Sequence, residues 1–414
     1  MAANHLTFVR AGRLVDVVAG EVRPAQAITI RGERIESVGP DDGSVPEGAR
    51  LIDLSAYSVL PGLIDCHAHM IGEVESGHGY AGLVQRTGAQ EALSGVPNAR
   101  DTVLAGFTTV RDVGTFRAFV DVALRDAIEA GDVLGPRMRC AGAFVTSAGG
   151  GGDVTGLAPD VDEVVPRELR FGVADSADEV RAAVRRILHG GADFIKVIAT
   201  GAVLTEGTNP GAPEFSEAEI RAAVEEASLY DAHVAAHAHG AEGIKRAVRA
   251  GVRSIEHGSL MDDEAIALMA EAGTYLVADV WEGDWIAERG RRDGWSEHVL
   301  RKNDETTEAQ RLGFAKCVEA GVRLAYGTDS GVYPHAMVAT QFGTMVKYGM
   351  SPLEAIRSAT VVAAELIGWG DGVGAIEPGR YADVIGVAGD PLEDVGVLTD
   401  VSVVIKGGEL VKAG

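Results

Sequence analysis

Short apolar runs broken by turn residues occupy both ends of the chain. Near the N-terminus they span residues 6–10, 27–31, 34–38 and 50–54, and near the C-terminus residues 382–387 and 401–406. Their period-two alternation, interrupted by Gly and Asp, predicts short strands and, at the N-terminal end, a small antiparallel sheet. Because the pattern stops and then resumes, we expect the two ends to form one discontinuous β-sandwich domain.

The middle of the chain alternates strand-like and helix-like segments. The strand candidates span residues 60–69, 107–112, 138–142, 194–199, 233–237, 253–257, 275–279 and 323–329. Helix starts are marked by Ser followed three residues later by Glu, at Ser176, Ser216 and Ser351, the last with Pro352 at the first helical position. Eight such units predict a (β/α)₈ (TIM) barrel. A doubly wound open sheet stays possible on periodicity alone, although no Gly-rich dinucleotide fingerprint follows the first strand.

These patterns predict a division of the chain into three parts. Residues 1–57 would form the N-terminal arm of the β-sandwich domain, residues 58–375 the barrel, and residues 376–414 the C-terminal arm. A length of 414 residues with 46% hydrophobic content agrees with one large domain and a smaller one.

Charge and cysteine usage restrict the partners and the compartment. The formal net charge of −24 disfavours nucleic acids and anionic membranes, because the long-range field would repel them. Cys66, Cys140 and Cys317 are odd in number and far apart, which suits a reducing compartment. The chain opens without a charged and apolar leader, and no apolar run approaches the roughly 20 residues of a spanning helix. We expect a soluble cytoplasmic protein.

Potential metal ligands stand at the ends of the predicted strands. His67 and His69 close the first strand, where residues two apart share one face and Cys66 turns away into the packing. Lys196 lies within an apolar run, and His237, His257 and Asp329 end three others. Since a barrel gathers the carboxyl ends of its strands at one face, these side chains are predicted to meet in a metal site there. Each has an ordinary alternative as a rim or core residue.

The motifs Gly62-Leu-Ile-Asp-Cys-His-Ala-His69, Gly106-Phe-Thr-Thr-Val-Arg-Asp112, Ile255-Glu-His-Gly258 and Gly379-Arg-Tyr-Ala-Asp383 carry a family resemblance. Together with Lys196, His237 and Asp329 they resemble the binuclear-metal branch of the amidohydrolase superfamily. Within it the chain is most similar to the Xaa-Pro dipeptidases and carboxypeptidase-like enzymes, including the ochratoxin-hydrolysing amidases. The resemblance covers nearly the whole chain. It implies a homo-oligomeric hydrolase that cleaves an amide bond with metal-activated hydroxide.

The resemblance also implies a role for each ligand. His67, His69 and Asp329 would hold the more buried metal, and His237 and His257 the more exposed one. Lys196, carbamylated, would bridge both, because an ammonium cannot ligate a cation whereas a carbamate offers oxygen and negative charge. Zn²⁺ suits these mixed ligands best, with Mn²⁺, Co²⁺ or Fe²⁺ as substitutes. Asp329 would then shuttle the proton from the attacking water to the leaving amine.

Two positions bear on the substrate. His239 projects to the same side as His237, and by resemblance it touches the substrate carbonyl; its alternative is a solvated loop histidine. Gly151 stands where several relatives carry a histidine in Gly-Gly-His-Gly-Asp, so one donor to the substrate is missing. The implied substrate is a dipeptide, an N-acyl amino acid or an ochratoxin-like amide that releases a C-terminal amino acid.

Other functions stay in view. Lactone, ester or cyclic amide hydrolysis would use the same metal site. Deamination and imidazolonepropionase-like ring opening are disfavoured, because Gly240 replaces the glutamate of the one-metal branch and the bridging lysine is present. A non-catalytic scaffold is a further alternative. Residues 279–292, with two tryptophans and three arginines, would form either a substrate-contacting lid or a surface helix or subunit contact.

Overall fold

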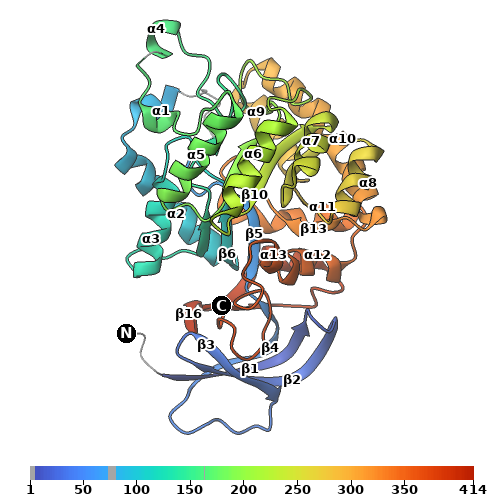
Figure 1. Ribbon diagram of the computed structural model, residues 1–414. Helices are drawn as coiled ribbons and strands as arrows, with labels where there is room; N and C mark the ends of the chain where they lie inside the picture. Colours follow the sequence, from blue (N-terminus) through green and yellow to red (C-terminus); the bar gives the residue numbers. More distant parts are fainter. Residues whose placement is uncertain (1–4, 73–80, 163) are drawn as a thin grey trace.

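The computed structural model describes residues 5–72, 81–162 and 164–414. A large lobe of strands and helices stands above a smaller, mostly β lobe, which contains the strands β1–β4 and β14–β16 from the two terminal parts of the chain (Figure 1). The arrangement is the predicted combination of a (β/α)₈ barrel with a β-domain from both chain ends.

The barrel strands follow the predicted segments. They are β5 (Leu63–Ala68), β6 (Phe107–Asp112), β7 (Arg137–Cys140), β8 (Phe144–Val145), β9 (Ile195–Ile198), β10 (Val234–Gly240), β11 (Ser254–Leu260), β12 (Tyr275–Ala278) and β13 (Arg323–Tyr326). The short strands β7 and β8 are two parts of the third barrel strand, since β7 pairs with β6 and β8 pairs with β9. All the ladder pairings between them are parallel.

The sheet closes on itself where the first strand meets the last. The Asp329 amide donates to the His67 carbonyl at 2.8 Å, and the His69 amide donates to the Ser330 carbonyl at 2.7 Å. These bonds join the end of β5 to the segment after β13, so the open doubly wound sheet is not the fold. Closure also places the carboxyl ends of all barrel strands around one opening.

Helices surround the barrel, and Figure 1 shows them outside the strands. The α-helices are α1 (Ala81–Gln85), α2 (Gly88–Leu104), α3 (Val120–Ala130), α4 (Pro159–Asp162), α5 (Ala177–His189), α6 (Glu217–Ser228), α7 (Ala241–Ala250), α8 (Asp263–Ala272), α9 (Glu282–Asp293), α10 (Glu297–Ala320), α11 (Gln341–Lys347), α12 (Pro352–Ser358) and α13 (Val361–Leu366). Short 3₁₀ helices span Arg167–Leu169, His335–Thr340 and Val395–Thr399. The predicted starts are confirmed: Ser176, Ser216 and Ser351 cap α5, α6 and α12.

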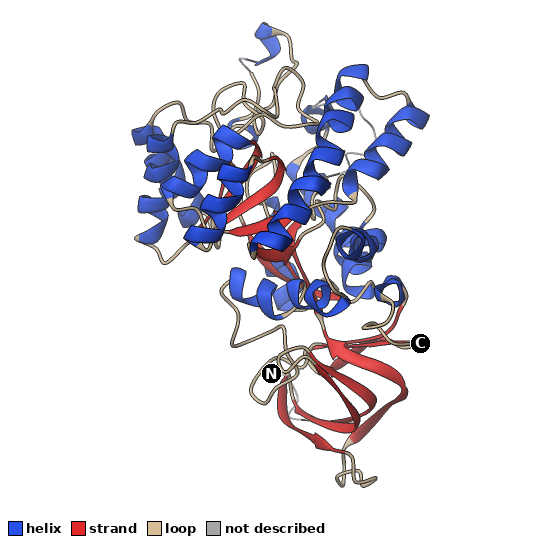
Figure 2. Ribbon diagram, turned by 90° about the vertical axis from the view of Figure 1, so that its right-hand side faces the viewer, coloured by secondary structure: helices blue, strands red, loops and turns tan. Residues whose placement is uncertain are grey.

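The smaller lobe is a curved seven-stranded sheet (Figure 2). Its order is β16-β15-β14-β4-β1-β2-β3, with β1 (Leu6–Asp16), β2 (Glu21–Arg31), β3 (Arg34–Pro40), β4 (Arg50–Pro61), β14 (Val384–Val387), β15 (Val401–Lys406) and β16 (Glu409–Lys412). Its inner face buries a cluster that includes Val9, Ile28, Val59 and Ile405. As predicted, β1, β2 and β3 pair in the antiparallel direction, but β4 returns beside β1 in the parallel direction.

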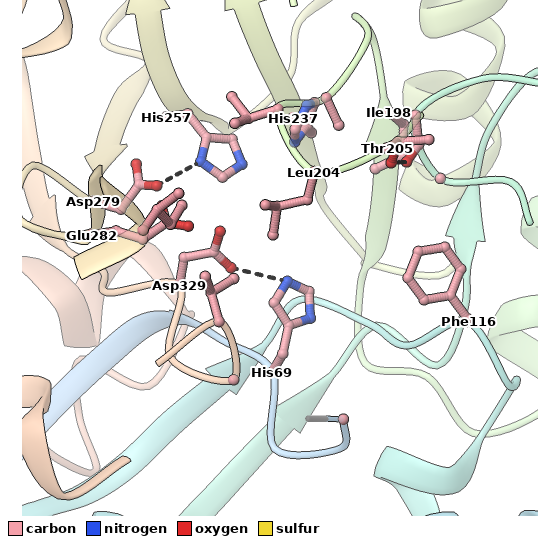
Figure 3. Close-up of a pocket in the computed structure, with 18 of the residues that line it drawn as sticks. His69, Phe116, Ile198, Leu204, Thr205, His237, His257, Asp279, Glu282 and Asp329 are labelled. Atoms are coloured by element: carbon pink, nitrogen blue, oxygen red, sulfur yellow. Dashed lines mark hydrogen bonds and ion pairs between the residues drawn. The ribbon is translucent and has the colours of Figure 1, made fainter. Parts of the chain in front are cut away.

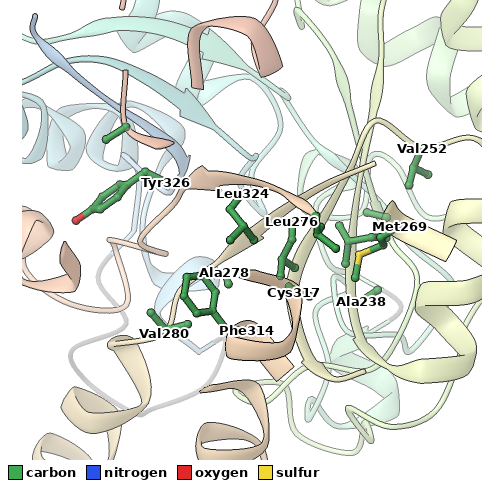
Figure 4. Packing of buried hydrophobic residues seen from close by; sticks show 14 of the residues in the cluster. Ala238, Val252, Met269, Leu276, Ala278, Val280, Phe314, Cys317, Leu324 and Tyr326 are labelled. Atoms are coloured by element: carbon green, nitrogen blue, oxygen red, sulfur yellow. The ribbon is translucent and has the colours of Figure 1, made fainter. Parts of the chain in front are cut away.

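The main core fills the space between the barrel strands and their helices. Figure 4 shows Leu276 and Leu324 of neighbouring strands packed near Phe314 and Cys317 of α10. These side chains are almost completely buried, and their removal from water is the main stabilising term for the barrel. The rigid barrel therefore fixes the strand ends that carry the candidate site.

Two further predictions concern the domain boundaries and the cellular location. The division at residues 57/58 and 375/376 stays a prediction; β4, a strand of the β-domain sheet, continues to Pro61, and the first barrel strand, β5, begins at Leu63. Within the described ranges, no helix combines the length and the apolar character that crossing a bilayer requires. The cytoplasmic location stays a prediction.

Candidate functional site

A large cavity opens at the carboxyl ends of the barrel strands. Its volume is about 400 Å³. Every residue predicted for the site lines it, namely His67, His69, Lys196, His237, His239, His257 and Asp329. Figure 3 shows His257, His237, Asp329 and His69 arranged around a common space, although they come from strands far apart in the sequence.

The end of the first strand is locked in place by a buried carboxylate. Asp65 accepts hydrogen bonds from the His67 amide at 3.0 Å and from the Thr328 amide and hydroxyl. One side chain therefore ties β5 to the segment that carries Asp329. Cys66, as expected from the alternation, points away into a separate cluster of buried apolar residues.

Two of the site residues have strained backbones. His257 has φ of 68° and Asp329 has φ of 56°, in the left-handed region that residues other than Gly rarely adopt. Such strain persists only where the surroundings hold it, and it concentrates at functional sites. Here the ladder of β11 and the hydrogen bond from the Asp329 amide to His67 hold the two residues.

The imidazoles of His67, His69 and His257 are each oriented by a partner on Nδ1, whereas His237 lies with its Nε2 3.3 Å from the Gly201 carbonyl. His67 contacts Glu256 at 2.8 Å, His69 contacts the Gly114 carbonyl at 2.7 Å, and His257 contacts Asp279 at 2.9 Å. These partners leave Nε2 as the nitrogen that faces the cavity. Outer partners of this kind are how proteins fix the tautomer and direction of metal-ligating histidines.

The inward-facing atoms fit metal ions. His67 Nε2 and Asp329 Oδ1 are buried without a hydrogen-bond partner and lie 3.4 Å apart, and His69 Nε2 is 3.2 Å from the same oxygen. Buried polar atoms left without partners cost free energy, which a shared cation would remove. Potential ligand atoms of His67, His257 and Asp329 lie within 4.8 Å of one another, as do those of His237, His239 and His257. The two groups share His257, so the donor set suits a pair of neighbouring ions.

The lysine lies at the same cavity. Lys196 is only 2% exposed, and burial lowers its pKa to about 8, although Glu256 and Asp329 favour the charged form. A substantial neutral fraction near pH 8 makes the amine nitrogen available for reaction. For Asp329, burial alone would raise the pKa, but His67 and His69 hold it well below its usual value.

His239 is more enclosed than a solvated loop histidine would be. It is 5% exposed, its Nδ1 lies 2.8 Å from the Ser259 hydroxyl, and its ring stacks on His257 at 4.7 Å between centroids. Burial lowers its pKa well below the ordinary value, so the ring is neutral. The predicted position near the substrate agrees with this location, and the ring is also close enough to His237 and His257 to act as a ligand.

Some site residues were missed by the sequence reasoning. Arg111 and Glu256 are both fully buried in the barrel and form an ion pair at 2.7 Å, and Glu256 in turn orients His67. Asp279 and Glu282 lie within 4.8 Å of potential ligand atoms of His257 and Asp329. A signal for such residues was available in the sequence, because a charged side chain inside or at the end of an apolar run is expected to have a buried partner. The motifs around Arg111 and Glu256 both contain such a charged residue.

Gly151 lies at a crowded point of the cavity wall. Gly151 lines the cavity, and its amide donates to Glu214 at 2.8 Å. A Cβ added to it would lie 3.1 Å from both the Ala202 nitrogen and the Ile198 side chain, so the neighbours would have to shift to admit a histidine. The absence of a histidine donor at residue 151 therefore coincides with a close contact between Gly151 and Ala202, in the segment after β9.

The segment of residues 279–292 lines the cavity with only part of its residues, and neither its two tryptophans nor its three arginines are among them. At the start of α9, Glu282, Gly283 and Ile286 line the cavity. Its three arginines instead pair with acidic side chains, Arg289 and Arg292 with Asp293 and Arg291 with Asp304. The segment thus supplies one wall of the pocket, and these arginines do not line it.

Comparison with known proteins agrees with this geometry. The model of the Amidohydrolase family matches residues 58–411. The ochratoxinase of Aspergillus niger is 33% identical over 432 aligned positions, covering 98% of this chain and 87% of the relative. A crystal structure of a Xaa-Pro dipeptidase with bound methionine in the active site is 40% identical, with a TM-score of 0.91 and coverage of 98% and 99%.

A prolidase structure in complex with N-methylphosphonate-L-proline is 33% identical, with a TM-score of 0.90 and coverage of 99% and 100%. These comparisons confirm the family resemblance noted from the motifs, and they cover nearly the whole length of this chain. Members of this family typically depend on two metal ions, and the donor groups of the cavity could bind such ions. The chain belongs to the Amidohydrolase family, in its dipeptidase and ochratoxinase-like group, and is a hydrolase that acts on C–N bonds.

Proposed function

We propose that this protein is a dinuclear, zinc-dependent amidohydrolase that releases a C-terminal amino acid from a dipeptide, an N-acyl amino acid or an ochratoxin-like amide. The observation that carries the proposal is the convergence of His67, His69, His237, His257 and Asp329 with Lys196 around one cavity. The names of the relatives, a Xaa-Pro dipeptidase and an ochratoxinase, support the substrate class.

The proposed ligand assignment takes one donor set around Asp329, whose carboxylate oxygen lies 3.4 Å from His67 Nε2 and 3.2 Å from His69 Nε2, and a second from the neighbouring pair His237 and His257. His67, His69 and Asp329 would hold one ion, and His237 and His257 the other. Lys196 would bridge them after its neutral amine nitrogen bonds to the carbon of carbon dioxide and loses a proton, which gives a carbamate. When bound, the two ions supply water activation and polarisation of the substrate carbonyl.

Side chains of the protein would carry out the proton transfer and orient the substrate. We propose that Asp329 accepts the proton of the attacking water and gives it to the leaving amine, since its carboxylate faces the cavity and stays ionised. His239, anchored through Nδ1 by Ser259, would present Nε2 to the substrate oxygen. The bulky apolar lining supports an apolar acyl or side-chain group in the substrate; it includes Phe116, Phe144, Ile198, Leu204 and Val332.

The test is a panel of amides and related compounds with the zinc-loaded protein. Dipeptides, N-acyl amino acids, aryl amides and lactones would be compared by chromatography of the products. We expect release of free amino acids, and a loss of about 10²–10⁴ in kcat for Asp329→Asn. Asp304→Asn, which changes an exposed carboxylate on α10, is the matched control and should keep full activity. Turnover of lactones alone would contradict the amidase assignment.

The metal assignment has its own measurements. Elemental analysis of the purified protein should find two ions per chain, with zinc restoring activity after chelation. In ¹³C-labelled bicarbonate, NMR should detect a carbamate signal that disappears in Lys196→Met. A protein that holds no metal under any of these conditions would favour the non-catalytic scaffold.

Assembly as a homo-oligomer is also proposed, and light scattering of the purified protein would test it.

A further inference from the structure

One wall of the cavity is an irregular segment after β9. Residues 202–208, here called the wall segment, contribute Ala202, Val203, Leu204 and Thr205 to the lining. Figure 3 shows Leu204 directed into the space between His237, Asp329 and Phe116. Leu204 also packs against a small cluster of apolar residues from the opposite wall, Ile286, Trp295 and Val332. Its position therefore decides how much apolar volume a substrate finds beside the candidate ligands.

The wall segment has no strand or helix to satisfy its carbonyl groups. Lys302, from α10, does so instead: its ammonium donates to the carbonyls of Ala202 at 2.8 Å, Thr205 at 2.7 Å and Thr208 at 3.4 Å. An ammonium has three donors and a compact shape, so it can serve three carbonyls that converge on one point. Backbone carbonyls buried without such a partner would be costly.

Lys302 is a buried lysine whose ammonium bonds only to backbone carbonyls of the wall segment. The side chain is only 4% exposed, and within residues 5–72, 81–162 and 164–414 its ammonium makes no ion pair, although the carboxylate of Glu206 in the wall segment favours its charged form. Burial lowers its pKa to about 8, which reflects the cost of keeping a cation there. A buried cation that is paired only with the carbonyls of one segment holds that segment and nothing else.

The wall segment is fastened on its other side as well. The Thr205 hydroxyl donates to the Gly151 carbonyl at 2.7 Å, which joins the segment to the Gly-rich loop of the third barrel strand. The Thr208 hydroxyl lies 3.2 Å from the Ala202 carbonyl and 3.1 Å from the Thr205 carbonyl. Lys302 thus sits beneath a closed turn whose outer surface faces the cavity.

We propose that Lys302 is a positioning residue for substrate selection: by pinning the wall segment it holds Leu204 in the cavity and disfavours bulky acyl groups, so that among the substrates proposed above small acyl groups are preferred to large aryl ones. This inference rests on the proposed amide hydrolysis, because it specifies which amides the proposed active site accepts. Without the ammonium, the three carbonyls must find water, the turn relaxes outward, and Leu204 withdraws. Lys302 acts only through Leu204, because its own ammonium is spent on the carbonyls.

The test compares two amides that share a leaving amino acid, N-acetyl-phenylalanine and N-naphthoyl-phenylalanine. The measured quantity is the ratio of kcat/KM for the bulky amide to that for the small one. This ratio does not depend on how much of a variant is folded. We expect it to rise about tenfold in Lys302→Met and in Leu204→Ala, the size of effect that a few methylene groups produce in an apolar pocket. The double variant should rise no further than Leu204→Ala alone.

Lys406→Met is the matched control. Lys406 also has a pKa lowered to about 8 by burial and donates to a backbone carbonyl, that of Gly135 at 2.6 Å, but it lies in the β-domain. Its removal should leave the ratio unchanged. If Leu204→Ala changes the ratio and Lys302→Met does not, Lys302 is merely structural and the proposal is wrong. If neither variant changes the ratio, the wall segment does not select the substrate and the proposal also fails.

A second measurement needs no substrate. Glu206 is exposed within the wall segment, so a glutamate-specific protease can cut there once the turn opens. The chain should be cut after Glu206 at least about tenfold faster in Lys302→Met than in the unmodified protein or Lys406→Met. Equal cutting rates would refute the pinning. If the unmodified protein hydrolyses neither these two amides nor any dipeptide or amide of the wider panel, the proposed function is wrong and the selectivity falls with it, while the cutting rates still decide whether Lys302 holds the turn.

Discussion

The ion pair inside the barrel gives the sharpest test of the structural reasoning. Arg111 and Glu256 have no exposed side-chain surface, and their charged groups lie 2.7 Å apart. Arg111 also donates to the Cys66 carbonyl at 2.6 Å and to the Ser254 hydroxyl at 3.0 Å. Burial opposes ionisation of Glu256, but Arg111 and His67 hold its pKa well below the usual range, so the carboxylate stays charged.

Replacing Arg111 by Met should leave that buried charge without its ion-pair partner. The removal of one partner from a buried pair costs about 3–5 kcal/mol, because the remaining ion cannot regain its hydration. In Arg111→Met/Glu256→Gln no uncompensated charge remains, so the double variant should be more stable than Arg111→Met by about 2 kcal/mol. The exposed pair Arg291 and Asp304, at 2.9 Å, is the control, and Arg291→Met should cost less than about 1 kcal/mol.

Urea unfolding of the metal-stripped proteins, followed by circular dichroism, measures these differences. Metal titration adds a second readout: because Glu256 orients His67, Glu256→Gln should weaken metal binding by about 10–100-fold. The reasoning is refuted if Arg111→Met costs no more than Arg291→Met. It is also refuted if the double variant is no more stable than Arg111→Met.

Three further predictions concern pH, a helix cap and the metal. His233 stacks on Phe194, and burial lowers its pKa to about 3 from the ordinary 6.5. The unfolded chain therefore binds the extra proton between these values, and stability falls as the pH drops: about 2 kcal/mol should be lost between pH 7 and pH 5. His233→Phe should remove that part of the slope in urea unfolding at the two pH values, and an unchanged slope would contradict the assignment. Ser351→Ala should cost about 1 kcal/mol in the same assay, because the hydroxyl caps α12 together with Glu354; no loss would argue against the capping box. Zinc at a thousand times its Kd should stabilise the protein by about 4 kcal/mol, seen as a higher Tm, whereas a variant with His67→Asn should gain much less. An equal gain in that variant would place the metal elsewhere.

Much of the fold follows from local patterns. The apolar runs gave the positions of the barrel strands, and Ser176, Ser216 and Ser351 marked the helix starts that the structure confirms. Local patterning succeeds here because a strand or a cap depends on neighbours within a few residues. The parallel pairing of β1 with β4 was not foreseen, since the direction of a returning strand is set by a crossover of many residues.

The amino-acid sequence by itself determined which side chains stand at the ends of the strands: His67, His69, His237, His257 and Asp329. Closure of the barrel then brings them to one cavity. Only the tertiary structure decided how that cavity is supported and shaped. The pairing of Arg111 with Glu256 and the hold of Lys302 on the wall segment join residues 145 and about 100 positions apart. No local period encodes contacts over such distances, because they depend on which faces the packed helices and strands present to one another.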